Sequence, residues 1–375
     1  MEGPRSARID EFNQVIDLIN NVFRITRNQK PTMQYEFPYL LNEKNINNMI
    51  VIKEDNKIVA DVNYLKQNIV VQGANIIAAS IGAVCTNSEY RGRRYSSKIL
   101  DKVEEQMKSE GIDVVLISGT RDLYRRRMCS MVKSHYKYEI TPNNEHIDFE
   151  IKEYEEEHLN KMIQLYNLNS TRYLRTYEEF KELLDSATIP WGTFSYKKYV
   201  ITKQDEVIGY LIIRVIDDDK KYGQVIEAYG DSNTIYMALR KLAYDLQLEN
   251  VCHYVHIKEY NNQFDKYDKR ELDCQQGTLK IINFEKFMKD LNTYFIQYVR
   301  KDILDKTMFT KEGEGYLIQF EDEKVIIDNV ESLNKLIFQG NTEKIKYINE
   351  CSNIKKFIET VFPIPFVWSA NLNYQ

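Results

Sequence analysis

The sequence has few cysteines and no cysteine motif. Its five cysteines lie far apart along the chain: Cys85, Cys129, Cys252, Cys274 and Cys351. No Cys-x-x-Cys pair occurs, and no histidine stands at ligand spacing from a cysteine. This pattern argues against a disulfide framework and against a zinc site, so we expect reduced thiols and no bound metal.

Long apolar runs and an excess of positive charge are missing as well. No run approaches the roughly 20 apolar residues that a membrane-spanning helix needs, and the first residues lack the apolar core of a signal peptide. We therefore expect a cytoplasmic protein that does not contact membranes. The formal net charge of -5 argues against nucleic-acid binding, because phosphate-tracking domains are usually basic overall. Any site for an anion has to be local.

What the chain does have is enough apolar material for several folded domains. It has 375 residues, of which 43% are hydrophobic and 29% are charged, and this length predicts two or three domains. Apolar spacing predicts a helix near 12–23, strands near 48–55, 57–65, 67–87 and 112–119, and a helix from about Ser96 to Ser109. Because a helix connects the last two strands, we expect them to be parallel.

A similar order of elements recurs after Pro142. A strand-like run and a helix are followed by a hairpin and a further strand over 197–231, a helix near 235–246 and a strand at 251–257. This order indicates an internal duplication at the level of the fold. Residues 259–273 are typical of a linker. A third unit then begins with a predicted helix from Phe284 to Val299 and ends in the tail FPIPFVWSANLNYQ.

One stretch concentrates positive charge. SEYRGRRYSSKIL, residues 88–100, carries Arg91, Arg93, Arg94 and Lys98 between a predicted strand and the start of a predicted helix. Backbone N–H groups at such a turn, the helix dipole and nearby guanidinium groups together favour a diphosphate ligand. A second cluster, Arg121, Arg125, Arg126 and Arg127, is a candidate for another phosphate of the same ligand. Taken singly, each arginine fits a solvated surface equally well.

The same stretch carries a family resemblance. IGAVCTNSEYRGRRYS, residues 81–96, resembles the acetyl-coenzyme-A-binding motif of the GNAT superfamily of N-acetyltransferases, Arg/Gln-x-x-Gly-x-Gly/Ala. The chain departs from this motif at Arg94, where the family has glycine, and at Ser96, where it has a smaller residue. A glycine permits close approach of a phosphate to the backbone, so the change at Arg94 bears directly on coenzyme affinity.

The resemblance extends over the rest of the chain. Residues 37–62 and 116–140, together with the motif, are similar to the enhanced-intracellular-survival branch of that superfamily. Its members have two GNAT-like domains followed by a sterol-carrier-protein-like domain, which residues 277–291 and the tail resemble. The resemblance implies an α/β (α+β) fold: two tandem GNAT-like domains with mixed sheets, plus a carboxy-terminal sterol-carrier-protein-like α+β domain.

The implied domains are 1–143, which binds acetyl-coenzyme A, 144–266, a degenerate GNAT-like domain, and 270–375, the sterol-carrier-protein-like domain. At the turn equivalent to the basic stretch, the second domain has Ala228-Tyr229-Gly230-Asp231-Ser232-Asn233, which is acidic and has no arginine. A diphosphate would be repelled there. We therefore expect the second domain to bind no coenzyme and to shape the substrate cleft and an oligomer interface instead.

The resemblance also implies site residues. Tyr124 matches the family tyrosine that protonates the coenzyme thiolate, and the carboxylate of Gln375 matches the terminal group that accepts the amine proton. Amides of Val84 and Cys85, at a splayed strand, would hold the thioester carbonyl and the pantetheine arm. The coenzyme phosphates would contact the segment Arg91, Gly92, Arg93, Arg94, Tyr95 and Ser96.

Each of the other residues near the implied site has either a functional or a purely structural interpretation. The Cys85 side chain is expected to pack as a small apolar group, because no histidine or lysine stands beside it to activate the thiol. Glu36 is a second candidate acid or base, or else an exposed surface glutamate. Residues between Phe23 and Leu41, with Trp191, are candidates to line a substrate channel, or else belong to ordinary core.

The leading hypothesis is an acetyl-coenzyme-A-dependent N-acetyltransferase, with acetyl-coenzyme A as its co-substrate. The acceptor would be a primary amine of a small molecule or of a lysine, and we expect a homo-oligomer. The alternative, motivated by Arg94, is a noncatalytic GNAT-fold scaffold or ligand-sensing protein. A third reading, a lipid carrier, predicts a large apolar tunnel in the last domain.

Overall fold

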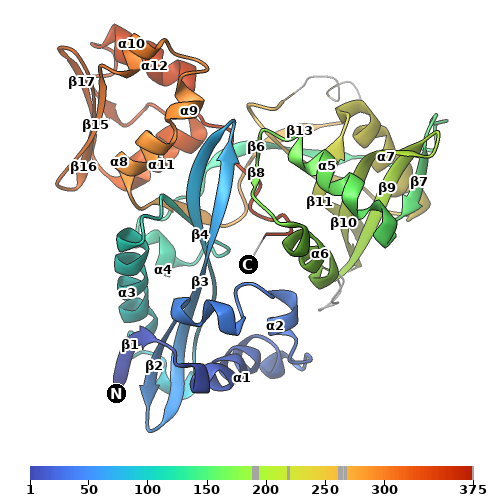
Figure 1. Ribbon diagram of the computed structural model, residues 1–375, viewed down its shortest axis with the longest axis horizontal. Coiled ribbons are helices and arrows are strands. Elements are labelled where there is room, and N and C mark those ends of the chain that lie inside the picture. The colour runs from blue at the N-terminus through green and yellow to red at the C-terminus, as the bar shows by residue number, and fades with distance from the viewer. Residues whose placement is uncertain (188–193, 218–219, 261–264, 266–267, 374–375) are drawn as a thin grey trace. The chain divides into compact units, whose positions relative to one another are not determined.

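Three β-sheets and the helices that cover them form the protein, shown in Figure 1 as a computed structural model. The structure describes residues 1–187, 194–217, 220–260, 265 and 268–373. The chain divides into two units, Met1–Lys133 with Gln275–Ser369 and Ser134–Cys274 with Ala370–Asn373. Within the described residues, no helix is both long and apolar enough to cross a lipid bilayer.

The first sheet has the strand order β1-β2-β3-β4-β5-β14. Its first five strands are β1 (Glu2–Ser6), β2 (Met49–Glu54), β3 (Lys57–Val71), β4 (Ala74–Thr86) and β5 (Val114–Ile117), and the sixth is β14 (Thr278–Ile281). All neighbours are antiparallel except β4 and β5, which are parallel and connected through α3 (Tyr95–Ser109). This confirms the predicted strand, helix, strand crossover.

The two faces of this sheet carry separate cores, because side chains alternate along a strand. On β2, Ile50 and Ile52 pack with the apolar stripe of α3, whereas Met49 and Val51 pack with α1 (Phe12–Phe23) and α2 (Met33–Glu36). Short 3-10 turns complete the amino-terminal part: Ile9–Glu11, Ile25–Arg27, Glu43–Asn48 and Ser88–Tyr90. A sheet with both faces covered leaves its strand ends as the places for a ligand.

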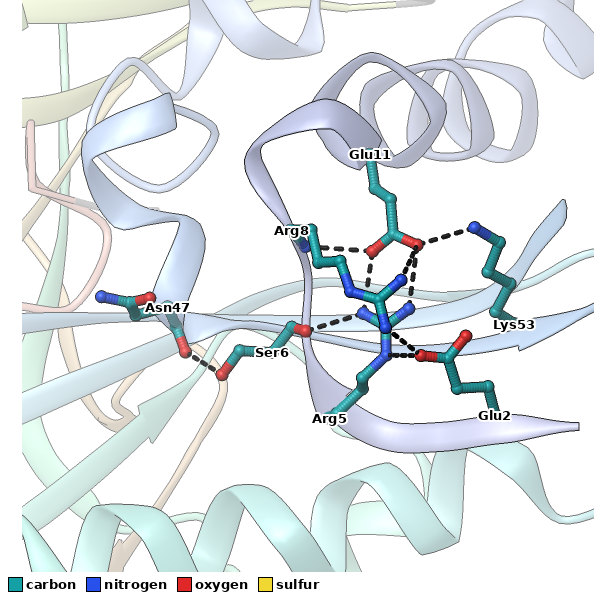
Figure 2. A network of polar contacts seen from close by, with 7 residues as sticks. All are labelled: Glu2, Arg5, Ser6, Arg8, Glu11, Asn47 and Lys53. Atoms are coloured by element: carbon teal, nitrogen blue, oxygen red, sulfur yellow. Dashed lines mark hydrogen bonds and ion pairs between the residues drawn. The ribbon is translucent and has the colours of Figure 1, made fainter. Parts of the chain in front are cut away.

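A polar network fastens the amino terminus to this sheet (Figure 2). Glu11 is only 1% exposed, and its carboxylate accepts two hydrogen bonds of 2.8 Å from the guanidinium of Arg5 and one of 2.8 Å from Lys53. The backbone N–H of Arg8 donates a further bond of 3.0 Å to it. One carboxylate thus connects β1, β2 and the start of α1.

The second sheet has the order β13-β6-β12-β11-β10-β9-β7. Its strands are β6 (Lys133–Ile140), β7 (Glu150–Glu153), β9 (Phe194–Lys203), β10 (Glu206–Asp217), β11 (Lys221–Gly230), β12 (Val251–His256) and β13 (Arg270–Cys274). The second unit also contains η5 (Glu156–His158), α5 (Leu159–Asn167), β8 (Thr171–Tyr173), α6 (Tyr177–Ser186) and α7 (Ser232–Asp245). Strands β11 and β12 are parallel and joined by α7, so the order of β3, β4, α3 and β5 recurs in β10, β11, α7 and β12.

The carboxy-terminal part forms a small antiparallel sheet, β15 (Thr307–Glu312), β16 (Gly315–Phe320), β17 (Glu323–Ile327) and β18 (Ile345–Lys346). Its helices are α8 (Phe284–Asp290), α9 (Asn292–Phe295), α10 (Lys301–Leu304), α11 (Val330–Gln339) and α12 (Ser352–Val361). The single helix predicted from Phe284 to Val299 is wrong, because α8 ends before Leu291 and a separate short helix follows. The predicted linker is wrong for its last residues, because β13 pairs with β6 from Arg270 onward.

Aromatic rings fill the interior of this part. Phe295 contacts Phe309, Phe357 and Phe362 with ring centroids 5.7–6.2 Å apart. Phe338 stacks on Phe287 and meets Phe366 edge to face. Such ring contacts are typical of a packed apolar core. The lipid-carrier hypothesis stays a prediction.

β6 and β14 lie outside the sheet that their sequence position suggests. β6 falls within the predicted first domain but pairs with β12 in the second sheet. The place beside β5 is instead taken by β14, from the predicted third domain. The three-domain division with boundaries at 143/144 and 266/270 stays a prediction.

Candidate active site

Strands β4 and β5 separate at their carboxyl ends. They pair from Ala78 and Val114 as far as Ile81 and Ile117, after which β4 continues to Thr86. In the same place β4 has a bulge, because Asp61 of β3 pairs with Cys85 but Asn63 pairs with Gly82. Within these described strands Val84 therefore has no paired residue. The splayed strand predicted at Val84 and Cys85 is present, and splays of this kind expose backbone groups to a ligand.

The basic stretch forms the turn between β4 and α3. Arg91, Gly92, Arg93 and Arg94 are all exposed, and both Gly92 (φ 82°) and Arg94 (φ 61°) have left-handed backbone conformations. The position where the family motif has glycine is therefore one that favours glycine for conformational reasons. In this chain Arg94 occupies that position, although its side chain disfavours the left-handed conformation.

The amino terminus of α3 has no side-chain cap. Arg94 is the N-cap residue and makes no capping hydrogen bond, and the first intrahelical bond runs from Lys98 N–H to the Arg94 carbonyl, 3.1 Å. Tyr95 and Ser96 therefore begin the helix with amides that no intrahelical acceptor can reach. Helix α3 has 15 residues, and its N-cap residue, Arg94, is positively charged. Together with the free backbone N–H groups of the first turn, this charge makes the start of the helix suited to bind an anion.

Side chains around the turn hold its shape. Arg93 forms an ion pair of 3.0 Å with Glu54 of β2 and lies 4.8 Å from the ring of Tyr90. The Ser96 hydroxyl lies 2.9 Å from that of Thr86, at the end of β4. Tyr95 is buried in the core on the α3 face. Of the predicted phosphate contacts, Arg91 and Arg94 thus extend into solvent, while Tyr95 and Ser96 offer their backbone.

We expect Arg94→Gly to raise the free energy of unfolding by about 0.5–1 kcal/mol. Glycine removes the strain of roughly 1–2 kcal/mol that a residue with a side chain has in the left-handed conformation. It also increases the conformational entropy of the unfolded chain, which offsets part of this gain. Arg94→Ala is the matched control, because it removes the guanidinium and keeps the strain, so its stability stays within about 0.5 kcal/mol of the parent. Urea denaturation of the three proteins measures the difference, and equal midpoints for Gly and Ala would contradict it.

The second basic cluster is not a single phosphate site. Arg127 is an internal tether: its guanidinium pairs with Asp101 and with Glu104 of α3 and donates to the carbonyl of Ser97, 2.7 Å. Arg125 pairs with Asp122 on the surface of α4 (Asp122–Arg125). The prediction that all four arginines serve a ligand is therefore wrong for Arg127, which ties the turn after β5 to α3.

Tyr124 lies on α4, close to the splay. It is 5% exposed and belongs to the same apolar cluster as Tyr95, Ile81 and Ile117, against which Val84 also packs. Its ring rests on Gly119, where an added Cβ would lie 2.7 Å from the ring. Burial raises the pKa of the Tyr124 hydroxyl above its usual value, so the group carries its proton at neutral pH. Within the described residues this hydroxyl makes no hydrogen bond, so its proton is available to a ligand.

A buried polar pair beside the bulge was not foreseen. Asp61 and Asn63 are fully buried on β3, hydrogen-bonded to each other, and Asp61 lies opposite Cys85. Burial raises the pKa of the Asp61 carboxyl well above its usual value, and burial, followed by the nearby Asp61, raises that of the Cys85 thiol. Cys85 is thus a packed, protonated thiol. The only signal in the sequence was the polar residues within the apolar run KIVADVNYL.

Glu36 is a structural residue rather than an exposed one. It is 8% exposed and its carboxylate accepts hydrogen bonds from Arg24 and from the Thr32 hydroxyl. Because both oxygens are engaged, it is a poor candidate for an acid or base. Several residues proposed for a channel are ordinary core on the α1 face, namely Met33, Leu40 and Leu41. Trp191 and Gln375 lie outside the described residues.

The equivalent helix of the second unit differs in chemistry. The carboxylate of Asp231 caps α7 by accepting from the backbone N–H of Thr234, 3.0 Å, and from its hydroxyl, 3.1 Å. A carboxylate already occupies the place where a diphosphate would bind α3. The expectation that only the first helix receives a phosphate ligand stays a prediction.

Comparison with known proteins bears on the same region. Residues 4–131 match the family model Acetyltransf_9, which describes an acetyltransferase (GNAT) domain. Residues 4–131 are therefore similar to a GNAT acetyltransferase domain. The splay of β4 and β5, the basic turn and Tyr124 all lie within it. No curated protein matches the chain.

Several solved structures resemble the fold of almost the whole chain. A GCN5-related N-acetyltransferase from Anabaena variabilis has a TM-score of 0.64 at 12% identity, over 98% of this chain and 97% of that one. A conserved protein from Enterococcus faecalis, a probable N-acyltransferase, has 0.65 at 12% over 97% and 96%. Eis1 from Mycobacterium abscessus has 0.59 at 12% over 97% of both chains. At such low identity the likeness concerns the fold alone.

Proposed function

We propose that the protein is an acetyl-coenzyme-A-dependent N-acetyltransferase whose acceptor is a primary amine of a small molecule or of a lysine. The observation that carries this proposal is the geometry of the acetyltransferase domain. A splayed, bulged strand, an uncapped cationic helix start and a buried, protonated tyrosine lie around one strand end. A cytoplasmic location, a homo-oligomer and the Eis-like branch are parts of the same proposal.

The residues present fit the coenzyme. The free amides at the start of α3 and the exposed guanidinium groups of Arg91 and Arg94 provide donors for a diphosphate. The unpaired segment of β4 at Val84 provides backbone groups for the thioester and the pantetheine arm, in the manner of a β-strand addition. Acetyl-coenzyme A supplies the activated acyl group as a co-substrate.

The transfer needs two proton movements besides the exchange of bonds. The amine nitrogen forms a bond to the thioester carbonyl carbon while the carbon–sulfur bond breaks. Backbone N–H groups at the bulge stabilise the negative charge that develops on the carbonyl oxygen. Tyr124 gives its proton to the departing thiolate, and the carboxylate of Gln375 takes the proton that the amine loses.

Isothermal titration with acetyl-coenzyme A tests the first requirement. We expect saturable binding with one site per chain, weakened by added salt because the diphosphate contacts are ionic. An absence of detectable heat at millimolar ligand would contradict the proposal. Turnover is then measured with a panel of primary amines and lysine peptides, by following release of the free thiol.

A noncatalytic scaffold or ligand-sensing protein is the second candidate, favoured by Arg94 at the glycine position. If the Arg94 side chain obstructs the diphosphate site, the parent protein binds coenzyme weakly and Arg94→Gly tightens binding at least about tenfold. If Arg94 instead pairs with phosphate, Arg94→Gly and Arg94→Ala both weaken binding. The direction of the change separates the two candidates.

A further inference from the structure

The carboxy-terminal segment Ala370–Asn373 belongs to the second unit, together with Ser134–Cys274. Ala370, Leu372 and Asn373 are each at most 7% exposed. A tail that is buried in this way has specific partners rather than a loose end.

Those partners surround a buried ion pair. Arg175 and Glu227 side chains are each 1% exposed and form a bidentate pair, of which the contact from Nη1 measures 3.1 Å. The Arg175 guanidinium lies 4.3 Å from the ring centroid of Tyr166 and 5.2 Å from that of Phe180. The Tyr210 hydroxyl donates to Glu227, 3.1 Å. The pair is therefore enclosed on its remaining sides by aromatic rings.

The tail contacts both members of the pair. Arg175 Nε donates a hydrogen bond of 2.6 Å to the Asn373 side-chain oxygen. Glu227 Oε1 accepts one of 3.4 Å from the Leu372 backbone N–H. A turn, in which the Asn373 N–H donates to the Asn371 side chain at 2.7 Å, fixes the segment locally. Release of the tail would leave the Nε of a buried guanidinium without this acceptor, which is unfavourable in a dry interior.

The position of Glu227 has a counterpart in the acetyltransferase domain. Ile212 of β10 pairs with Glu227 and Ile213 pairs with Val225, so β11 has its extra residue at Ile226. The bulge of β4 at Ala83 and Val84 lies on the corresponding strand of the first sheet. Where the first sheet has an unpaired strand segment next to a thiol, the second has a carboxylate that is already paired with Arg175.

We propose that Arg175 and Glu227 are positioning residues that clamp Leu372 and Asn373 of the carboxy-terminal segment. The inference rests on the proposed function in one respect, the role of the Gln375 carboxylate as proton acceptor. The second unit uses the bulge of its own sheet to hold this segment.

The test compares Asn373→Ala with Tyr210→Phe in the full-length chain. Asn373→Ala removes the acceptor for Arg175 Nε and leaves the ion pair intact. Tyr210→Phe removes one hydrogen bond to Glu227 and leaves every tail contact in place, so it is the matched control. We prefer these variants to Arg175→Met, which strands a buried carboxylate and endangers folding.

Hydrogen–deuterium exchange gives the readout that does not depend on activity. In Asn373→Ala we expect exchange of the peptide containing Leu372 to accelerate about tenfold or more, while peptides from β10 and β11 stay unchanged. Tyr210→Phe should leave the tail peptide as in the parent. Equal tail exchange in the parent and Asn373→Ala overturns the clamp, whether or not the protein acetylates amines.

Kinetics test the positioning role. With a turned-over amine, Asn373→Ala should lower kcat about tenfold with an unchanged KM for acetyl-coenzyme A, because only the proton acceptor is displaced. Tyr210→Phe should leave kcat within about twofold. Faster tail exchange with an unchanged kcat overturns the positioning role but keeps the clamp. A parent protein that binds no acetyl-coenzyme A refutes the proposed function and, with it, the role in catalysis.

Discussion

Tyr124→Phe should lower kcat for acetyl transfer about 10²-fold, with the KM for acetyl-coenzyme A changed less than about threefold. The ring stays in place because phenylalanine keeps its packing against Gly119 and the surrounding apolar cluster. Only the proton donor is lost, and the thiolate then leaves without general-acid assistance. Steady-state assays of thiol release measure both constants.

The control for this prediction is Tyr64→Phe. Tyr64 is fully buried in the same cluster, but its hydroxyl donates to Glu110, 2.9 Å away, rather than towards the splay. The same chemical change there should leave kcat within about twofold, whatever it does to stability. If Tyr124→Phe is as active as Tyr64→Phe, Tyr124 is not the acid, and the noncatalytic scaffold becomes the better reading.

Glu11→Ala destabilises the first unit by about 3 kcal/mol. It leaves Arg5 and Lys53, which are 22% and 17% exposed, without the carboxylate that they share (Figure 2), and it breaks the connection between β1, β2 and α1. Loss of one partner from a buried ion-pair network typically costs about 3–5 kcal/mol, and partial exposure of the cations favours the low end. Urea denaturation followed by circular dichroism checks the expected fall of the first unfolding midpoint.

The control here is Glu2→Gln. Glu2 contacts the same Arg5 at 2.6 Å but is 43% exposed, so its loss should change the free energy of unfolding much less than Glu11→Ala does. A Glu2→Gln variant as unstable as Glu11→Ala would show that burial is not the decisive factor.

We expect acid to lower the free energy of unfolding of the parent protein by protonating Glu11. The bond from Arg5, strengthened by Lys53 and by the backbone of Arg8, holds the pKa of Glu11 far below its usual value of 4.5 in the folded state. Because the folded pKa is depressed, the stabilisation is complete above about pH 4.5 and is lost progressively as the pH falls below it. Glu11→Ala should therefore show a shallower loss of stability between pH 5 and about pH 3, and parallel curves would contradict this.

Local patterns were enough for elements whose partners are close in sequence. The apolar stripe of α1 and that of α3 predicted both helices within a residue or two. The boundary predicted between the strands 57–65 and 67–87 is wrong, because β3 continues to Val71 and β4 begins at Ala74. The splay at Val84 was expected from the resemblance to the motif and is present, whereas the left-handed backbone of Arg94 was not predicted. The break at Leu291 was missed because the apolar spacing continues across it.

Side-chain roles that depend on distant partners could not be predicted. Glu36 and Arg127 are both charged and were read as functional or exposed, yet each is paired with residues on another element. Asp61 gave only the weak signal of a polar residue in an apolar strand. A carboxylate or guanidinium looks the same in a sequence whether it faces solvent, a ligand or a buried counter-ion.

The sequence by itself determined the strand and helix order, the crossover that makes β4 and β5 parallel, and the basic turn between them, because these follow from side-chain periodicity and residue type within a short span. Only the tertiary structure decided that β14, rather than β6, pairs with β5, and that Arg175 and Glu227 hold the tail. Strand edges present the same N–H and C=O groups to any partner, so the choice between them depends on packing over the whole unit.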